Sequence, residues 1–102
     1  MNLKFDAEQF DKQQAILAAE IAERVMIKLQ EAGMEGAKLE ESTASITFSI
    51  ASIIDDMAAI ESAGMEVRPY LTFRMGDEEL LHCGENSCTN TFVYDDLKKL
   101  FG

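Results

Sequence analysis

Residues 5–34 read FDAEQFDKQQAILAAEIAERVMIKLQEAGM and carry the clearest structural signal in the chain. Asp6, with Gln9 three residues later, resembles the capping box that begins a helix. Phe5 and Phe10 occupy the two positions of a hydrophobic staple around that cap. Apolar side chains then recur at helical spacing, at Phe10, Leu17, Ile21, Val25, Leu29 and Ala32. The stretch is therefore predicted to form one long helix.

This helix is predicted to span residues 7–32 and to stop at Gly33, which can adopt the left-handed conformation that ends many helices. Met34 is placed to fold back on Leu29, as in a Schellman motif. Residues 60–66 repeat this ending as IESAGME, so the same helix cap is predicted a second time.

Residues 37–63 fit two patterns. A helical pattern groups seven positions on one face, namely Leu39, Thr43, Ile46, Ile50, Ile53, Met57 and Ile60. A strand pattern over 43–50 groups four, namely Ala44, Ile46, Phe48 and Ile50. We favour a second helix, which would form an antiparallel hairpin with the first across the turn at Gly33–Gly36, and keep the strand as the alternative. The other face of this helix is expected to pack on a sheet through Ala44, Phe48, Ala51 and Ala59.

The last third of the chain has the alternation of a small antiparallel sheet. Val67–Met75 alternates as a strand, and Gly76–Asp77 suits a two-residue turn into a second strand over about 79–83. Thr89–Tyr94 is predicted to be a third strand. Asp95 would then cap a short final helix with apolar residues at Leu97, Leu100 and Phe101.

Charge pairs support this strand register. With a two-residue turn, Arg74 lies opposite Glu79 and Arg68 lies opposite Glu85. Pro69 cannot donate to a ladder, so the first strand is expected to have a free edge there.

These elements predict one α+β domain over residues 1–102, with a long antiparallel helical hairpin, a small antiparallel β-sheet of two or three strands, and a short C-terminal helix. A chain of 102 residues is near the most common domain size, and an apolar share of 47% is ordinary for a globular protein.

The charge balance excludes several classes of partner. Nineteen acidic residues against nine basic ones give a net charge of −10, which repels nucleic-acid backbones and anionic membranes. No apolar run approaches the roughly 18 residues of a membrane span. The first ten residues contain no signal-peptide core, and two cysteines make no disulfide framework, so a cytoplasmic location is expected.

His82, Cys83 and Cys88 form the one cluster with metal-ligating or nucleophilic residue types. Their spacing is not that of zinc ribbons, and a strand would point His82 and Cys83 to opposite faces. Cys83 and Cys88 would flank a four-residue hairpin loop, which makes them a candidate redox pair. The single histidine has no nucleophile-elbow sequence to support it, so neither an enzyme nor a cofactor is predicted.

The leading functional hypothesis is a small non-enzymatic interaction protein that forms a homodimer. Ile16 and Ile27 lie about 100 to 140 degrees from the main apolar stripe of the first helix, among polar residues, and are the candidate dimer contact. One alternative is a redox-responsive regulator that uses the cysteine pair. Another is an acidic inhibitor that mimics nucleic acid, which would require a continuous acidic ridge through Glu40, Glu41, Asp55, Asp56 and Glu61.

Overall fold

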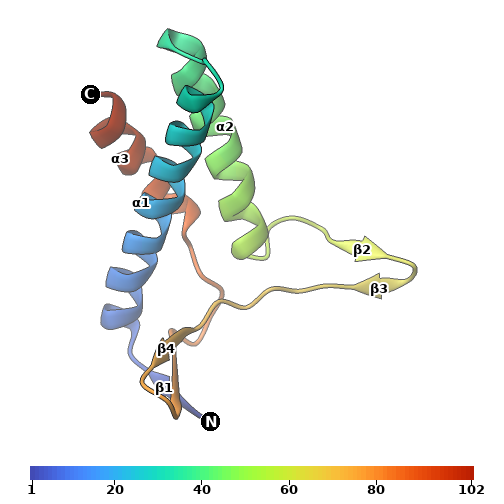
Figure 1. Ribbon diagram of the computed structural model, residues 1–102. Helices are drawn as coiled ribbons and strands as arrows, with labels where there is room; N and C mark the ends of the chain where they lie inside the picture. Colours follow the sequence, from blue (N-terminus) through green and yellow to red (C-terminus); the bar gives the residue numbers. More distant parts are fainter.

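The structure is a computed structural model that describes all of residues 1–102. Its three helices are α1 (Ala7–Glu31), α2 (Gly36–Ile54) and α3 (Asn90–Phe101). Its five short strands are β1 (Asn2–Phe5), β2 (Glu61–Ser62), β3 (Met65–Glu66), β4 (Phe73–Met75) and β5 (Glu79–His82). The α+β class is confirmed, as is the order of a long helical hairpin, a small sheet and a C-terminal helix (Figure 1).

Helix α1 has the N-cap residue and the glycine stop that the local sequence predicts. The capping box is only half formed, because the Asp6 N–H donates to the His82 carbonyl, and Phe5 contacts His82 while Phe10 packs on Phe73. The Asp6 carboxylate accepts a hydrogen bond of 3.1 Å from the backbone N–H of Gln9. At the other end, Gly33 has φ +94°, and the Met34 N–H donates to the Leu29 carbonyl at 3.0 Å. These bonds are those of a Schellman motif, in which glycine avoids the steric penalty of the left-handed conformation.

Helix α2 confirms the helical interpretation of residues 43–50 but ends at Ile54, well before the predicted end at residue 63. The Asp56 N–H donates to the Ile53 carbonyl, and the Met57 N–H donates to Ser52. Asp56 has φ +60°, so this end is a second Schellman motif built on aspartate in place of glycine. Aspartate tolerates this conformation better than most residues, although it is a weaker stop signal than glycine.

Residues 60–66 do not repeat the helix cap. They form the β2–β3 hairpin, with Ser62 opposite Met65 and with positive φ at both turn residues, Ala63 and Gly64. Positive φ at both central positions is typical of a type I′ turn. The prediction of a second cap is wrong because α2 is already capped at Asp56. Gly64 instead occupies the turn of the hairpin.

The three-stranded sheet has the order β1-β5-β4. Strand β4 runs antiparallel to β5, with Arg74 opposite Leu80 and Met75 opposite Glu79. The predicted register is therefore wrong by one residue, because the connection contains three residues rather than two. The predicted strand Val67–Met75 contracts to Phe73–Met75, and β1, which pairs in parallel with β5, was not predicted.

The predicted third strand at Thr89–Tyr94 is wrong. Residues from Asn90 onward belong to α3, Thr89 is its N-cap residue, and Asp95 lies inside the helix rather than capping it. The cap is supplied from a distant part of the chain, as described below.

The core between the helices is lined by small and polar side chains. Its fully buried positions on α1 and α2 are Phe10, Gln14, Ala18, Ala22, Leu39, Thr43, Thr47 and Ala51. The buried face of α2 is rotated by roughly 70° from the predicted one, on a wheel of 100° per residue. Only 14 of the 102 residues are buried, so much of the aliphatic surface of both helices remains open.

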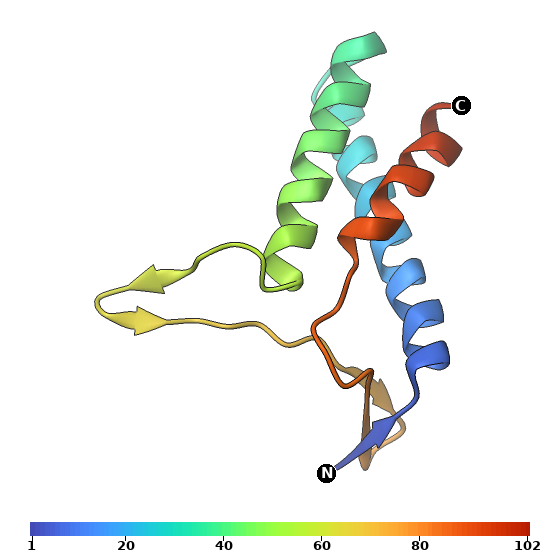
Figure 2. The same cartoon turned by 180° about the vertical axis from the view of Figure 1, so that it is seen from behind.

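Helix α3 contacts both α1 and α2 and covers one side of the hairpin. It lies in front of α1 and beside α2 in Figure 2, and passes behind α1 in Figure 1. Tyr94, Leu97 and Phe101 of α3 line a groove with Ala37 and Ala44 of α2. Ala44, which was expected to pack on the sheet, therefore faces α3, and Ala59 lies beyond the end of α2.

Candidate interaction surface

Asp55, immediately after α2, joins the end of that helix to the start of α3. Its Oδ1 accepts hydrogen bonds from the Ser87 hydroxyl at 2.6 Å, the Thr89 hydroxyl at 2.8 Å and the Thr89 N–H at 2.9 Å. Its Oδ2 accepts from the Asn90 N–H at 2.9 Å. Asp55 is 2% exposed, and its carboxylate accepts hydrogen bonds from the N–H groups at the start of α3. It therefore serves as a long-range N-cap for this helix.

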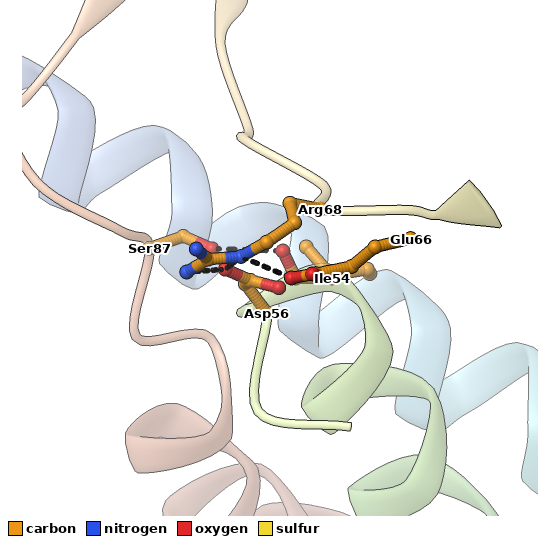
Figure 3. A network of polar contacts seen from close by, with 5 residues as sticks. All are labelled: Ile54, Asp56, Glu66, Arg68 and Ser87. Atoms are coloured by element: carbon orange, nitrogen blue, oxygen red, sulfur yellow. Dashed lines mark hydrogen bonds and ion pairs between the residues drawn. The ribbon is translucent and has the colours of Figure 1, made fainter. Parts of the chain in front are cut away.

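The next residue, Asp56, fixes the base of an arm that leaves the body of the molecule. Its Oδ2 accepts two hydrogen bonds from the guanidinium of Arg68, at 2.7 and 2.9 Å (Figure 3). Glu66 lies 3.7 Å from the same guanidinium. The hydrogen bond to Asp56 and the negative charges of Asp56 and Glu66 raise the pKa of Arg68 above its ordinary value. Asp55 thus binds the buried start of α3, whereas Asp56 binds Arg68 at the base of the arm.

The β2–β3 arm, residues 57–68, extends away from the helices and from the other sheet (Figures 1 and 2). Every residue from Glu61 to Arg68 is exposed. The Val67 N–H donates to the Ile60 carbonyl, which extends the two-residue ladder toward the base. Because side chains alternate along a strand, Ile60, Met65 and Val67 share one face, and Glu61 and Glu66 lie opposite each other on the other face. The arm is therefore amphipathic, and an isolated two-stranded hairpin of this kind is marginally stable in water.

A second exposed apolar region lies on the outer face of the three-stranded sheet. Leu3 and Phe5 are each 64% exposed. The Phe5 ring meets His82 edge-on at a centroid distance of 5.8 Å, and the Tyr70 hydroxyl lies 3.4 Å from His82 Nδ1. The single histidine is thus part of an aromatic group at the surface.

Cys83 and Cys88 are not the two ends of a hairpin loop. The Cys83 thiol donates to the Glu85 carbonyl at 3.2 Å. Cys88 is held by Gln14, whose amide donates to its sulfur and accepts from its N–H. Both cysteines are free thiols, and the hairpin on which their predicted proximity depended is absent because residues 90–94 are helical.

Ile16 and Ile27 lie on the outer surface of α1, 70% and 39% exposed. Ile27 shares a shallow hollow with Arg24 and Lys28. Arg24 pairs with Glu20 at 2.8 Å, and Lys28 pairs with Glu31 at 3.1 Å. The surroundings of Ile27 are therefore those of a solvated helix face.

The side of the helical hairpin opposite α3 carries a wider apolar surface, which we call the open hairpin face. Ile46 is 40% exposed and Ile53 is 46% exposed, and the other members are half-buried. Ile46 lines a shallow pocket of about 270 Å³ together with Val25 and Leu29, so side chains of both helices contribute to one surface. The face consists of Leu17, Ile21, Val25 and Leu29 of α1 and Ile46, Ile50 and Ile53 of α2. Sequence reasoning grouped these residues on the apolar stripes of two predicted helices, and no charged residue lies between Glu41 and Asp55.

The acidic ridge required for a nucleic-acid mimic is interrupted. Asp55 is buried under Ser87 and Thr89, and the side chain of Asp56 is 8% exposed and paired with Arg68. Two of its five carboxylates are therefore withdrawn from the surface.

No group of three or more histidine, cysteine, aspartate or glutamate side chains is arranged to hold a metal ion. None of the three helices is both long and apolar enough to cross a membrane.

Asp96 of α3 is a buried carboxylate that lacks a hydrogen-bond donor at one of its oxygens. It is 7% exposed, and its Oδ2 has no hydrogen-bond partner. Burial raises the pKa of the Asp96 carboxyl, Lys99 opposes this shift, and Asp95 adds to it. The folded protein therefore binds a proton at Asp96 more readily than the unfolded chain does, so this group stabilises the fold as the pH falls through its raised pKa and loses that contribution as the pH rises.

Asp96→Asn is expected to raise the free energy of unfolding at about pH 7 by on the order of 1 kcal/mol, because it removes a buried, unpaired charge. The advantage over the wild type should shrink at about pH 4, near the ordinary aspartate pKa. Urea unfolding of both proteins at the two pH values measures this difference in the free energy of unfolding. An advantage that is constant or larger in acid would show that the charge of Asp96 is not the cause.

No protein-family model matches the chain, and neither the curated proteins nor the solved structures include a significant match.

Proposed function

We propose that this protein is a small non-enzymatic interaction protein that acts through protein–protein contacts as a homodimer. The observation that carries the proposal is the amount of surface that the single chain leaves open. Its accessible surface is 6717 Å², whereas a folded monomer of 11.3 kDa is expected to expose about 5,700 Å². The excess of about 1,000 Å² is comparable to the roughly 800 Å² that each partner buries in a standard interface.

The shape of the molecule supports the same proposal. The radius of gyration is 15.4 Å, against about 12.8 Å for a compact domain of this length. The β2–β3 arm contributes to the difference, because it extends away from the helices and from the other sheet (Figures 1 and 2). Large contiguous apolar surface on a folded chain is a mark of interaction sites.

The polar groups also favour binding over catalysis. Asp55, the most buried carboxylate, has its hydrogen bonds taken up by the protein's own donors. His82 contacts Phe5 and Tyr70 and no carboxylate hydrogen bond orients it. Asp55 and His82 therefore have structural roles, in helix capping and in aromatic packing.

Light scattering at micromolar concentration tests the proposal. A mass of about twice 11.3 kDa is expected. The dimer dissociation constant should stay the same or fall as salt is added, because salt screens the repulsion between two chains of charge −10. A mass of 11.3 kDa at every concentration and salt level would refute the homodimer.

A further inference from the structure

We infer that the open hairpin face is the dimer interface, and that a second copy of this chain covers it to form a four-helix arrangement about a twofold axis. This inference rests on the proposed homodimer and adds the location and architecture of its contact. The surface involved is the side of α1 and α2 that α3 does not cover.

The charge pattern is the first argument. The chain contains 28 charged residues among 102, yet none lies between Glu41 and Asp55, a run that forms the C-terminal two-thirds of α2. A helix side bathed in water would be expected to carry some of them, whereas interface cores are depleted in charge. Ile46 and Ile53 are exposed within this uncharged run.

The edge of the face has the opposite character. Arg24 and Lys28 line the pocket in which Val25, Leu29 and Ile46 meet. Each of these two cations has an ion-pair partner on its own helix, Glu20 and Glu31 respectively. An apolar centre bordered by solvated, paired charges is the usual composition of a protein–protein interface.

The geometry favours a second copy as the occupant. Two antiparallel helices joined by a short turn present one flat apolar side, and two such sides related by a twofold axis bury the same residues on both chains. The small core beneath the face, with Ala18, Ala22 and Thr47 at its centre, lets α1 and α2 approach closely and leaves their aliphatic residues on the flank. The excess surface of about 1,000 Å², to which the β2–β3 arm also contributes, is comparable to the size of one such contact.

Two matched double variants test the inference in the full-length protein. Ile46→Glu with Ile53→Glu places charges on the open hairpin face, and Ile16→Glu with Ile27→Glu makes the same chemical change on the outer surface of α1. We expect the first to raise the dimer dissociation constant at least about a hundredfold, because both changes occur in both copies and central apolar contacts dominate binding. Ile16 and Ile27 border the face, because Ile16 shares a hollow with Leu17 and Ile27 shares one with Arg24 and Lys28. The second variant should leave the dissociation constant within about threefold of the wild type, because contacts at the rim of an interface are nearly neutral in energy.

Light scattering gives the mass of each variant, and far-UV circular dichroism shows whether it is folded. If the glutamate variant of Ile46 and Ile53 does not fold, the milder pair Ile46→Gln and Ile53→Gln replaces it, with an expected weakening of about tenfold. If the wild type is a dimer and the variant at Ile46 and Ile53 is equally dimeric, the inference is overturned while the proposed homodimer stands. Loss of the dimer in the Ile16 and Ile27 variant alone would place the contact on the outer surface of α1 instead. A wild-type monomer refutes the proposed homodimer itself, and the inference with it.

Discussion

Replacing Asp55 with alanine is expected to remove about 3–5 kcal/mol from the free energy of unfolding, a large part of the stability of a domain this size. The change deletes a carboxylate that accepts four hydrogen bonds in a buried site. It leaves the first N–H groups of α3, on Thr89 and Asn90, without an acceptor. Hydrogen bonds to charged groups contribute about 1.5–3 kcal/mol each, and an orphaned buried donor costs a similar amount. Chemical denaturation with circular dichroism measures the loss.

The adjacent residue provides the control. Asp56→Asn removes the ion pair with Arg68 but retains a side chain that tolerates the positive φ of this position. Because the guanidinium is 66% exposed, solvent screens the pair, and a loss below about 1 kcal/mol is expected. Equal losses for Asp55→Ala and Asp56→Asn would show that the buried network does not join α2 to α3.

Phe10→Ala is expected to destabilise the protein by about 3–5 kcal/mol. Phe10 is 0% exposed and packs against Phe73 at a centroid distance of 5.0 Å, which connects α1 to the three-stranded sheet. Removing the ring leaves a cavity in a core that has few other large side chains to fill it. Thermal or urea unfolding measures the effect.

A second phenylalanine, five residues earlier in the sequence, is the matched comparison. Phe5→Ala deletes an identical ring that is 64% exposed and contacts His82. Its loss should stay within about 1 kcal/mol, because little area leaves water on folding. A loss as large as that of Phe10→Ala would mean that the outer face of the sheet is covered in solution.

Features that depend on neighbouring residues were predictable from the sequence. The capping bond at Asp6 and the Schellman motif at Gly33 follow from side chains within a few positions of each helix end. The long hairpin of α1 and α2 and the α+β class follow from the period of the apolar residues.

Features that depend on distant contacts were not predictable in this way. Asp55 caps a helix that begins 35 residues later, so Thr89–Tyr94 has strand-like side chains but helical structure. Strand β1 pairs in parallel with β5 from the opposite end of the chain. The end of α2 at Asp56 uses a residue that rarely serves as a left-handed stop.

The candidate surface was found only in part. Periodicity grouped Ile46, Ile50 and Ile53 correctly on one face of α2, but it cannot separate a face buried within one chain from a face that is open to a partner. The face buried within the chain keeps Leu39 and Thr43 of the predicted group and adds Thr47 and Ala51, which the pattern did not include. Ile16 and Ile27 stood out in the sequence because their neighbours are polar, and those neighbours form ion pairs around Ile27.

The most direct measurement of the central claim is an isotope-filtered NOE experiment on a mixture of isotope-labelled and unlabelled protein, which detects only contacts between different chains. The account predicts intermolecular NOEs among the methyl groups of the open hairpin face, with Ile46, Ile50 and Ile53 of one copy close to α1 or α2 of the other. A dimer whose intermolecular NOEs are confined to other surfaces, such as the outer side of α1 at Ile16 and Ile27, would contradict it.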